Sequence, residues 1–212
     1  MFADMHFSIA TRKHAEEIEE FLHAEFGTRE PMTICLNPSR ADLSDNFRDL
    51  AHAGCSNEKY STLVHQRDRG RVTSKCLALQ EFPEIAKGPY KQHKANQLTA
   101  FVDAMEQALR RLPDAFTKYL KIDILCVAGD AKGRGLGKEL VQRAVKIARA
   151  EGCEWVTAVA TAAASQAIFS QLGFKTIYQI PFANFRENGV VVFNNLSDGC
   201  ISGKLVALRL ND

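Results

Sequence analysis

Apolar residues recur along the chain with two different periods, and the second half of the sequence carries the clearest pattern. Residues 119–128 and 155–160 are short apolar runs of the length expected of buried strands. Between them, residues 135–151 repeat apolar side chains every three or four positions, which predicts an amphipathic helix. A strand, a helix and a second strand in this order form a βαβ unit and indicate an α/β fold around a mixed sheet.

The rest of the chain predicts further helices and strands, without an internal repeat. The expected helices cover residues 11–26, 39–53, 96–112 and 165–172. The expected strands cover residues 5–10, 61–66, 72–81 and 175–180, followed by a final strand pair at 190–193 and 205–210. Residues 27–38 and 82–93 contain Pro and Gly, so we expect them to be irregular at least in part.

Length and composition exclude several classes of protein. The chain has 212 residues, 46% of them hydrophobic, which is enough to bury the core of one domain or a compact pair. The formal net charge is only +2, so we expect the chain to bind neither nucleic acid nor an acidic membrane surface. No run of roughly 20 apolar residues could span a bilayer, and residues 1–13 lack the apolar stretch of a secretory signal.

The six cysteines and six histidines are scattered, without the close spacings of a metal site. We therefore expect no metal centre, and we interpret the cysteines as reduced, mostly buried thiols of a cytoplasmic protein. Cys126 lies in an apolar run with no histidine or charged residue next to it, which favours a core thiol over a nucleophile.

A glycine-rich segment joins the 119–128 strand to the next helix. Its sequence, AGDAKGRGLGKEL over residues 128–140, fails the P-loop pattern because Lys132 and Glu139 stand where Gly and Ser or Thr are required. It also fails the GxGxxG dinucleotide pattern, which would need glycine in place of Lys138 or Leu140. A plain strand-to-helix turn is one interpretation, and a phosphate held by N–H groups at the helix N-terminus is the other.

Residues 132–137, KGRGLG, resemble the [QR]xxGx[GA] loop of the GNAT acetyltransferase superfamily, with Lys132 at the Gln or Arg position. The resemblance implies the GNAT acyl-CoA N-acyltransferase fold: a single domain over residues 1–212, with a mixed, mostly antiparallel central sheet flanked by helices. It implies that the loop binds the pyrophosphate of the co-substrate acetyl-CoA. It also implies that a backbone N–H near the end of the preceding strand polarises the acetyl carbonyl. The residues expected to bind acetyl-CoA are Cys126, Val127, Ala128, Lys132, Gly133, Arg134, Gly135, Leu136, Gly137 and Lys138.

Other segments extend this resemblance over nearly the whole chain. Residues 165–174, SQAIFSQLGF, resemble the helix and LGF element of the superfamily, but Phe169 stands where many members have a general-acid Tyr. Residues 29–33, REPMT, and residues 112–120, LPDAFTKYL, resemble elements of the insect-type arylalkylamine N-acetyltransferases. Arg29 replaces the acidic or amide residue usual in that family, which could change access to the amine site.

The resemblance assigns catalytic roles to three residues. Glu30 is the expected general base, because an alkylamine with a pKa of about 10.4 arrives as a non-nucleophilic ammonium ion. A base of this kind contributes on the order of 10²–10⁴ in rate. Glu30 could instead simply start a turn before Pro31. Ser165 is a possible proton donor or water-positioning group and could also cap its helix, and Thr161 is a weaker candidate.

The expected reaction is direct acetyl transfer in a ternary complex, to an arylalkylamine such as dopamine, tyramine, octopamine or serotonin. Phe182, Phe185 and Tyr178 are expected to line the amine pocket, with an ordinary core role as the alternative. A polyamine, amino acid or protein acceptor stays open, as does a catalytically inactive acyl-CoA-binding protein. A polyamine site would need several carboxylates, of which the sequence identifies Glu30. A monomer is favoured.

Overall fold

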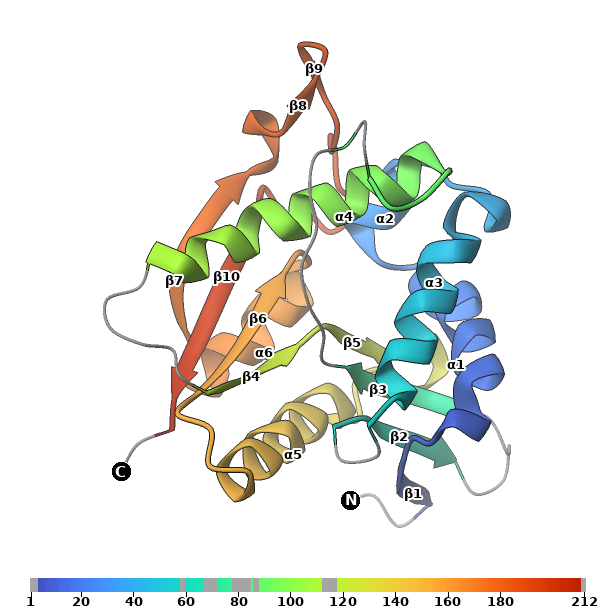
Figure 1. Ribbon diagram of the computed structural model, residues 1–212, viewed down its shortest axis with the longest axis vertical. Coiled ribbons are helices and arrows are strands. Elements are labelled where there is room, and N and C mark those ends of the chain that lie inside the picture. Colours follow the sequence, from blue (N-terminus) through green and yellow to red (C-terminus); the bar gives the residue numbers. More distant parts are fainter. Residues whose placement is uncertain are drawn as a thin grey trace.

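Two four-stranded sheets form the centre of the molecule (Figure 1). The computed structural model describes residues 4–57, 60–66, 72–77, 85, 88–111 and 118–210. In the first sheet the strands are β1 (Met5–Ile9), β2 (Thr62–Gln66), β3 (Val72–Leu77) and β5 (Ile124–Val127), paired antiparallel in that order. In the second sheet they are β4 (Tyr119–Ile122), β6 (Trp155–Ala160), β10 (Ser202–Arg209) and β7 (Lys175–Pro181). The β4–β6 pair is parallel and the others are antiparallel, which confirms the mixed sheet.

The strand predicted over residues 119–128 is divided at Asp123. Before this residue β4 pairs with β6, up to Ile122 opposite Ala158, and after it β5 pairs with β3, beginning with Ile124 opposite Leu77. One apolar run therefore serves both sheets, and β5 and β6 diverge beyond the break. A pattern of apolar residues shows that a segment is extended but not which neighbour it pairs with.

Helices cover both faces of this framework. The segment predicted as one helix at residues 11–26 consists of η1 (Arg12–His14), α1 (Ala15–Phe21) and the π-helical η2 (Leu22–Phe26). The other helical elements are α2 (Pro31–Cys35), α3 (Arg40–Cys55), α4 (His93–Glu106), η4 (Gln107–Arg111), η5 (Gly129–Ala131), α5 (Leu136–Ala150), α6 (Ala163–Gln171) and η6 (Phe182–Asn184). The helices α1 and α3 lie side by side, and α4 crosses the second sheet on the side opposite α5 (Figure 1).

Alternation along β6 separates two hydrophobic cores. Val156, Ala158 and Ala160 belong to the core beneath α5 and α6, whereas Val159 packs into the core on the α4 side. Side chains on a strand point alternately to its two faces. The same alternation places Leu120 and Ile122 beneath α5 and leaves the intervening residue of β4 free to face α4.

The predicted pairing of residues 190–193 with residues 205–210 is wrong. Residues 27–38 are irregular in part, as predicted, and they also contain the short helix α2. The strand expected at residues 190–193 is β9 (Val190–Val191), which pairs with β8 (Arg186–Glu187), while β10 pairs with β6 and β7. A pattern of apolar residues does not identify pairing partners. The predicted stretches at residues 78–81 and 112–117, and residues 82–84, 86 and 87 of the segment 82–93, lie outside the described residues.

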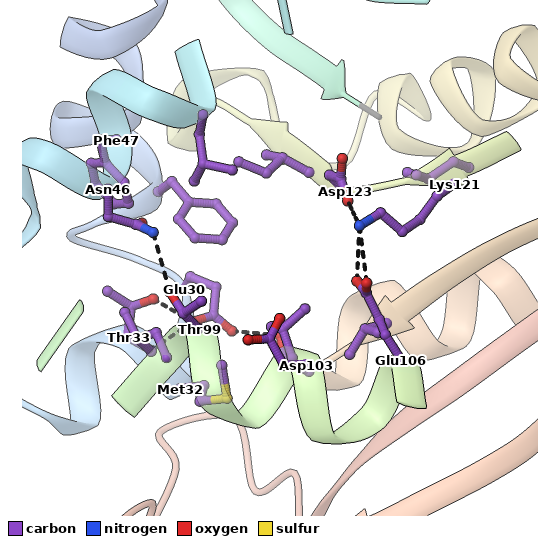
Figure 2. Close-up of a pocket in the computed structure, with 18 of the residues that line it drawn as sticks. Glu30, Met32, Thr33, Asn46, Phe47, Thr99, Asp103, Glu106, Lys121 and Asp123 are labelled. Carbon is purple, nitrogen blue, oxygen red and sulfur yellow. Dashed lines mark hydrogen bonds and ion pairs between the residues drawn. The ribbon is translucent and has the colours of Figure 1, made fainter. Parts of the chain in front are cut away.

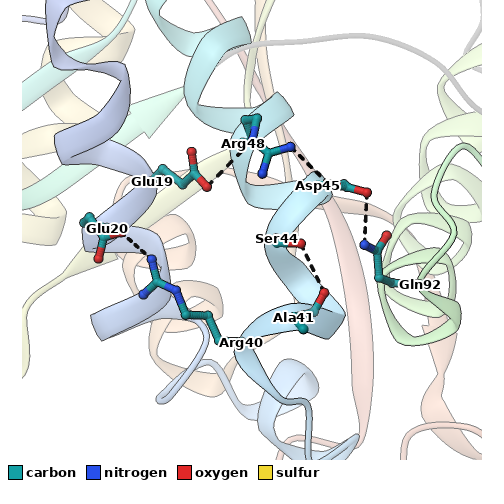
Figure 3. A network of polar contacts seen from close by, with 8 residues as sticks. All are labelled: Glu19, Glu20, Arg40, Ala41, Ser44, Asp45, Arg48 and Gln92. Carbon is teal, nitrogen blue, oxygen red and sulfur yellow. Dashed lines mark hydrogen bonds and ion pairs between the residues drawn. The ribbon is translucent and has the colours of Figure 1, made fainter.

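Polar contacts on the surface hold α3 between α1 and the start of α4 (Figure 3). The contacts join Arg40 to Glu20, Arg48 to Glu19 and Asp45, and Gln92 to Asp45. Exposed ion pairs of this kind contribute about 0–1 kcal/mol each. The opposite face of α3 carries side chains of the cavity described below. Within the described ranges, no helix is long and apolar enough to cross a membrane.

Candidate active site

The glycine-rich loop lies where β5 ends and α5 begins. Gly133 and Gly135 have φ angles of +77° and +79°, which L side chains rarely adopt, and Gly135 is the N-cap of α5. The N–H of Glu139 donates to the carbonyl of Gly135 over 3.1 Å, so the N–H groups of residues 136–138 have no acceptor within the helix. Such a helix N-terminus, preceded by glycines, can accommodate an anion.

Gly137 lies close to a side chain of α6. A Cβ atom built on Gly137 would lie 2.9 Å from Cδ1 of Ile168, so a larger residue would require the Ile168 side chain to move. The loop residues therefore have two separate requirements: left-handed backbone at two glycines and close packing at the third.

The basic side chains of this loop differ in their surroundings. Lys132 and Lys138 are exposed, while Arg134 is half-buried and its Nη2 lies 2.6 and 2.7 Å from the two carboxylate oxygens of Asp4. Behind the loop, the N–H of Gly129 donates to the buried Glu25 over 2.9 Å, and the carboxylate of Glu25 also pairs with Arg29 at 3.0 Å. Arg29 is therefore paired beneath the loop and does not line the cavity described next.

Cys126 lies in β5 with 7% of its surface exposed. Burial, reinforced by the neighbouring Glu25, raises the pKa of its thiol to about 12. The thiol is therefore protonated at neutral pH, as the core-thiol interpretation requires.

A cavity of about 170 Å³ opens where the two sheets separate (Figure 2). Its walls come from η2, α2, α3, α4, the β4–β5 break and the end of β6. The apolar and aromatic lining residues are Phe26, Met32, Phe47, Leu50, Tyr90, Leu98, Val102, Ile122, Ile124 and Val159. Glu30, Thr33 and Thr161 lie in the same lining, so two of the three predicted catalytic residues share one cavity.

Local structure fixes the position of Glu30. It is the N-cap of α2, followed by Pro31 at the first helical position, which is a favoured start for a helix. Its Oε2 accepts from the N–H and the hydroxyl of Thr33 at 2.5 and 2.7 Å. Glu30 therefore starts a local structure before Pro31 and also lines the cavity.

Thr161 lies directly after β6 and reaches the other oxygen of the same carboxylate. Its hydroxyl donates to Oε1 of Glu30 over 2.9 Å, across 131 positions of sequence. Burial raises the pKa of Glu30 above its ordinary value, against the lowering effect of the hydrogen bonds from Thr33 and Thr161. A carboxylate with a raised pKa is a stronger base than a free one, which suits proton removal from an ammonium group.

Ser165 does not have the predicted capping position. The helix α6 begins at Ala163 with Ala162 as its N-cap, and the Ser165 hydroxyl donates to the Ala162 carbonyl over 2.9 Å within the first turn. A carboxylate distant in sequence caps the helix instead: Oδ2 of Asp198 accepts from the Ala163 N–H at 2.7 Å. Phe169, in the same helix, is 2% exposed and packs on Phe174.

The three aromatic residues predicted to hold the amine lie elsewhere. Phe182 and Phe185 form a cluster with Phe101 and Phe193, with ring centroids 5.1–6.0 Å apart. Tyr178, in β7, packs against the same core and is not in the cavity lining. Sequence alone cannot distinguish an aromatic core residue from a pocket wall. The aromatic walls are instead Phe26, Phe47 and Tyr90, which the sequence analysis missed.

A second charged group in the cavity lining was also missed. Lys121 lies between two carboxylates, with its Nζ 3.0 and 3.1 Å from the oxygens of Glu106 and 2.7 Å from Oδ1 of Asp123. Asp103, one helical turn before Glu106 on α4, completes the group. The sequence did contain a signal: Lys121 and Asp123 are charged residues two apart in an otherwise apolar run.

The protonation of this group reflects its burial. Burial and the nearby Glu106 raise the pKa of Asp103 to about 7, against the lowering effect of Lys121. Burial also raises the pKa of Asp123 to about 7, opposed by Lys121. Among the described residues, no group of three or more His, Cys, Asp or Glu side chains could hold a metal ion.

Comparison with known proteins agrees with the predicted resemblance to the GNAT acetyltransferases and with the predicted fold. Residues 94–174 match the sequence model of the acetyltransferase (GNAT) family. This segment runs from α4 to Phe174 and includes both the glycine-rich loop and the LGF element. Among curated proteins, none matches the sequence.

Several solved structures have the same fold at low sequence identity. Arylalkylamine N-acetyltransferase 2 from Aedes aegypti is 20% identical, with a TM-score of 0.77 over 98% of this chain and 100% of that one. A polyamine N-acetyltransferase from Drosophila melanogaster that forms N-acetylagmatine is 19% identical, with a TM-score of 0.79 over 98% and 100%. The C-terminal condensation domain of Ebony, in complex with beta-alanyl-dopamine, is 17% identical, with a TM-score of 0.78 over 97% and 98%. Similarity at this identity establishes the fold of this chain.

Proposed function

We propose that this chain, which has the fold of the GNAT acetyltransferases and carries their family segment at residues 94–174, transfers an acetyl group from acetyl-CoA to a small primary amine. The observation that carries the proposal is the Glu30 carboxylate in a cavity at the point where β5 and β6 separate, held by Thr33 and Thr161. A carboxylate fixed in this way has one task that matches the chemistry, which is to receive the proton of the amine.

The loop at residues 132–138 fits the diphosphate of acetyl-CoA. It combines left-handed glycines with helix N–H groups that have no acceptor within α5, and the exposed Lys132 and Lys138 add positive charge beside them. Arg134 can contribute only after it separates from Asp4. When bound, acetyl-CoA supplies the acetyl group and a thiolate leaving group.

Glu30 accepts the amine proton during transfer. The amine nitrogen forms the new bond to the acetyl carbon, and the carbon–sulfur bond breaks. Thr33 and Thr161 orient the two oxygens of the carboxylate, so little reorganisation is needed when the proton moves. Cys126 takes no part because its thiol stays protonated.

The proton that reaches the sulfur needs a donor other than Phe169. Ser165 is the proposed donor or water-positioning group, since its hydroxyl is half-buried in the first turn of α6. The hydrogen bond to the Ala162 carbonyl orients this hydroxyl, and the Ser165 oxygen keeps its lone pairs for a water molecule.

Two classes of acceptor are supported by different parts of the cavity. Phe26, Phe47 and Tyr90 support an arylalkylamine such as dopamine, tyramine, octopamine or serotonin, because flat rings pack well on other rings. The carboxylates around Lys121 support a polyamine instead.

The test is thiol release from acetyl-CoA with arylalkylamines, polyamines and lysine peptides as acceptors. We expect turnover with small primary amines that collapses in Glu30→Gln. Glu20→Gln is the matched control, since Glu20 pairs with Arg40 on the exposed side of α1 and lies outside the cavity. Binding of acetyl-CoA without turnover of any amine would refute the proposal and favour an inactive acyl-CoA-binding protein.

A further inference from the structure

We propose that Asp103, Glu106 and Asp123 form a subsite for a second cationic group on the acceptor. The acceptor is then a primary amine with an ammonium or guanidinium group at its other end, rather than an uncharged aromatic ring. The inference rests on the proposed function in one respect: Glu30 receives the amine that is acetylated.

The charge balance at this end of the cavity favours a cation. Three carboxylates and one ammonium group line it, which leaves a net charge of −2 when all four are ionised. Lys121 is fully engaged with Glu106 and Asp123, so it does not neutralise Asp103 by direct contact.

Two buried oxygen atoms of this group, Oδ2 of Asp103 and Oδ2 of Asp123, make no hydrogen bond among the described residues. Asp103 is only 8% exposed, and its carboxylate lines the cavity (Figure 2). Buried carboxylate oxygens are normally hydrogen-bonded, and an unsatisfied one costs free energy. A cationic donor in the cavity would satisfy both atoms.

The raised pKa values of Asp103 and Asp123 are consistent with a site built for a missing positive charge. Each pKa is about 7, chiefly because of burial. An arriving cation favours the ionised form of both groups. Binding of such a ligand near neutral pH therefore releases protons to the solvent.

The shape of the cavity suits a short chain. The helix α4 contributes Leu98, Thr99, Val102, Asp103 and Glu106 along one face, a length of about 12 Å at 1.5 Å per residue. A volume of about 170 Å³ is close to that of an engineered cavity that holds benzene. Apolar side chains such as Met32, Leu98 and Val102 offer a surface for methylene groups between the carboxylates.

The experiment compares equilibrium binding of butane-1,4-diamine and butylamine by calorimetry, in the presence of saturating CoA. Diamines of three to six carbons and agmatine extend the series, and 2-phenylethylamine represents the aromatic class. We expect the best dication to bind at least 10-fold more tightly than butylamine to the unmodified protein. Buffers of different ionisation enthalpy should reveal proton release that is larger for the diamine.

Variants assign the effect to the subsite. Asp103→Asn should weaken diamine binding about 10-fold or more and change butylamine binding less than threefold. Asp123→Asn should act in the same direction, and Glu20→Gln should leave both affinities unchanged. Circular dichroism checks that each variant is folded, and the comparison of the two ligands on the unmodified protein needs no variant.

The outcomes separate this inference from the proposed function. Equal affinities for the mono- and diamines, or tighter binding of 2-phenylethylamine than of any dication, would overturn the subsite whatever the turnover. A diamine preference that is retained in Glu30→Gln, with turnover lost, supports both proposals. A diamine preference without turnover in the unmodified protein supports the subsite and refutes the acetyltransferase activity.

Discussion

The two ends of the cavity hold carboxylates in opposite ways. At one end both oxygens of Glu30 accept hydrogen bonds, from Thr33 and from Thr161. At the other end Asp103 and Asp123 each keep a buried oxygen that has no partner in the part of the chain that the structure describes, beside Lys121. Complete hydrogen bonding fixes geometry, which a base requires, whereas incomplete pairing preserves an attraction for something that is not part of the chain. On the two proposals above, the same functional group is adapted to two tasks by its neighbours.

The largest effect is expected when the carboxylate of Glu30 is removed. Glu30→Gln keeps the size of the side chain and abolishes its ability to accept a proton. We expect kcat/KM for any amine acceptor to fall by about 10²–10⁴, the range typical of a positioned base. Thiol release from acetyl-CoA measures the change. A loss of less than about threefold would show that another group takes the proton.

The second effect removes the ammonium group of Lys121, beside Asp103 and Asp123. Lys121→Met leaves three carboxylates around an apolar side chain. Breaking a buried ion pair from one side typically costs about 3–5 kcal/mol of the free energy of unfolding. The loss should be largest above pH 7, where the carboxyl groups cannot escape by protonation, and urea denaturation at pH 6 and 8 measures it. Lys94→Met, at the more exposed pair with Asp42, should cost at most about 1 kcal/mol.

The third change, Asp103→Asn, is expected to stabilise the fold, in contrast to Lys121→Met. The pKa of Asp103 is about 7 in the folded protein and about 3.9 when unfolded, so the folded state holds its proton more tightly between these values. Its ionisation therefore destabilises the fold increasingly as the pH rises from 4 to 7. Asp103→Asn should stabilise the protein at pH 8 by about 2–4 kcal/mol and have little effect at pH 4. Thermal unfolding across this range is the measurement, and Asp45→Asn on the surface of α3 is the matched control.

The smallest effect is expected when Glu30 is kept but loses one of its hydrogen bonds. Thr161→Val deletes the hydroxyl that donates to Glu30, and this hydrogen bond lowers the pKa of Glu30. Its loss should raise that pKa further and move the acid limb of the pH profile of kcat/KM upward, by less than about one unit. Thr28→Val, which removes an exposed hydroxyl, is the matched control. An unchanged profile would mean that Thr161 acts only in packing.

The sequence analysis found the Glu30 end of the cavity and missed the end that holds Asp103 and Asp123. Glu30 and the loop at residues 132–137 belong to short contiguous patterns, so a resemblance could indicate them. Asp103 and Asp123 come from separate elements, and their meeting depends on the break between β4 and β5. Because the sequence analysis predicted one continuous strand over residues 119–128, it missed the break at Asp123. It therefore also missed the end of the cavity that Asp103 and Asp123 line. The aromatic cavity walls at Phe26, Phe47 and Tyr90 depend likewise on how η2, α3 and the segment before α4 pack.

The division of one strand at Asp123 has a consequence for the assembly of the molecule. Neither sheet can complete its backbone hydrogen bonds until residues 119–127 have joined both, so the two halves should fold as one cooperative unit. The cavity takes its walls from both halves. On the proposed function, amine recognition and catalysis would therefore be lost together when this unit unfolds.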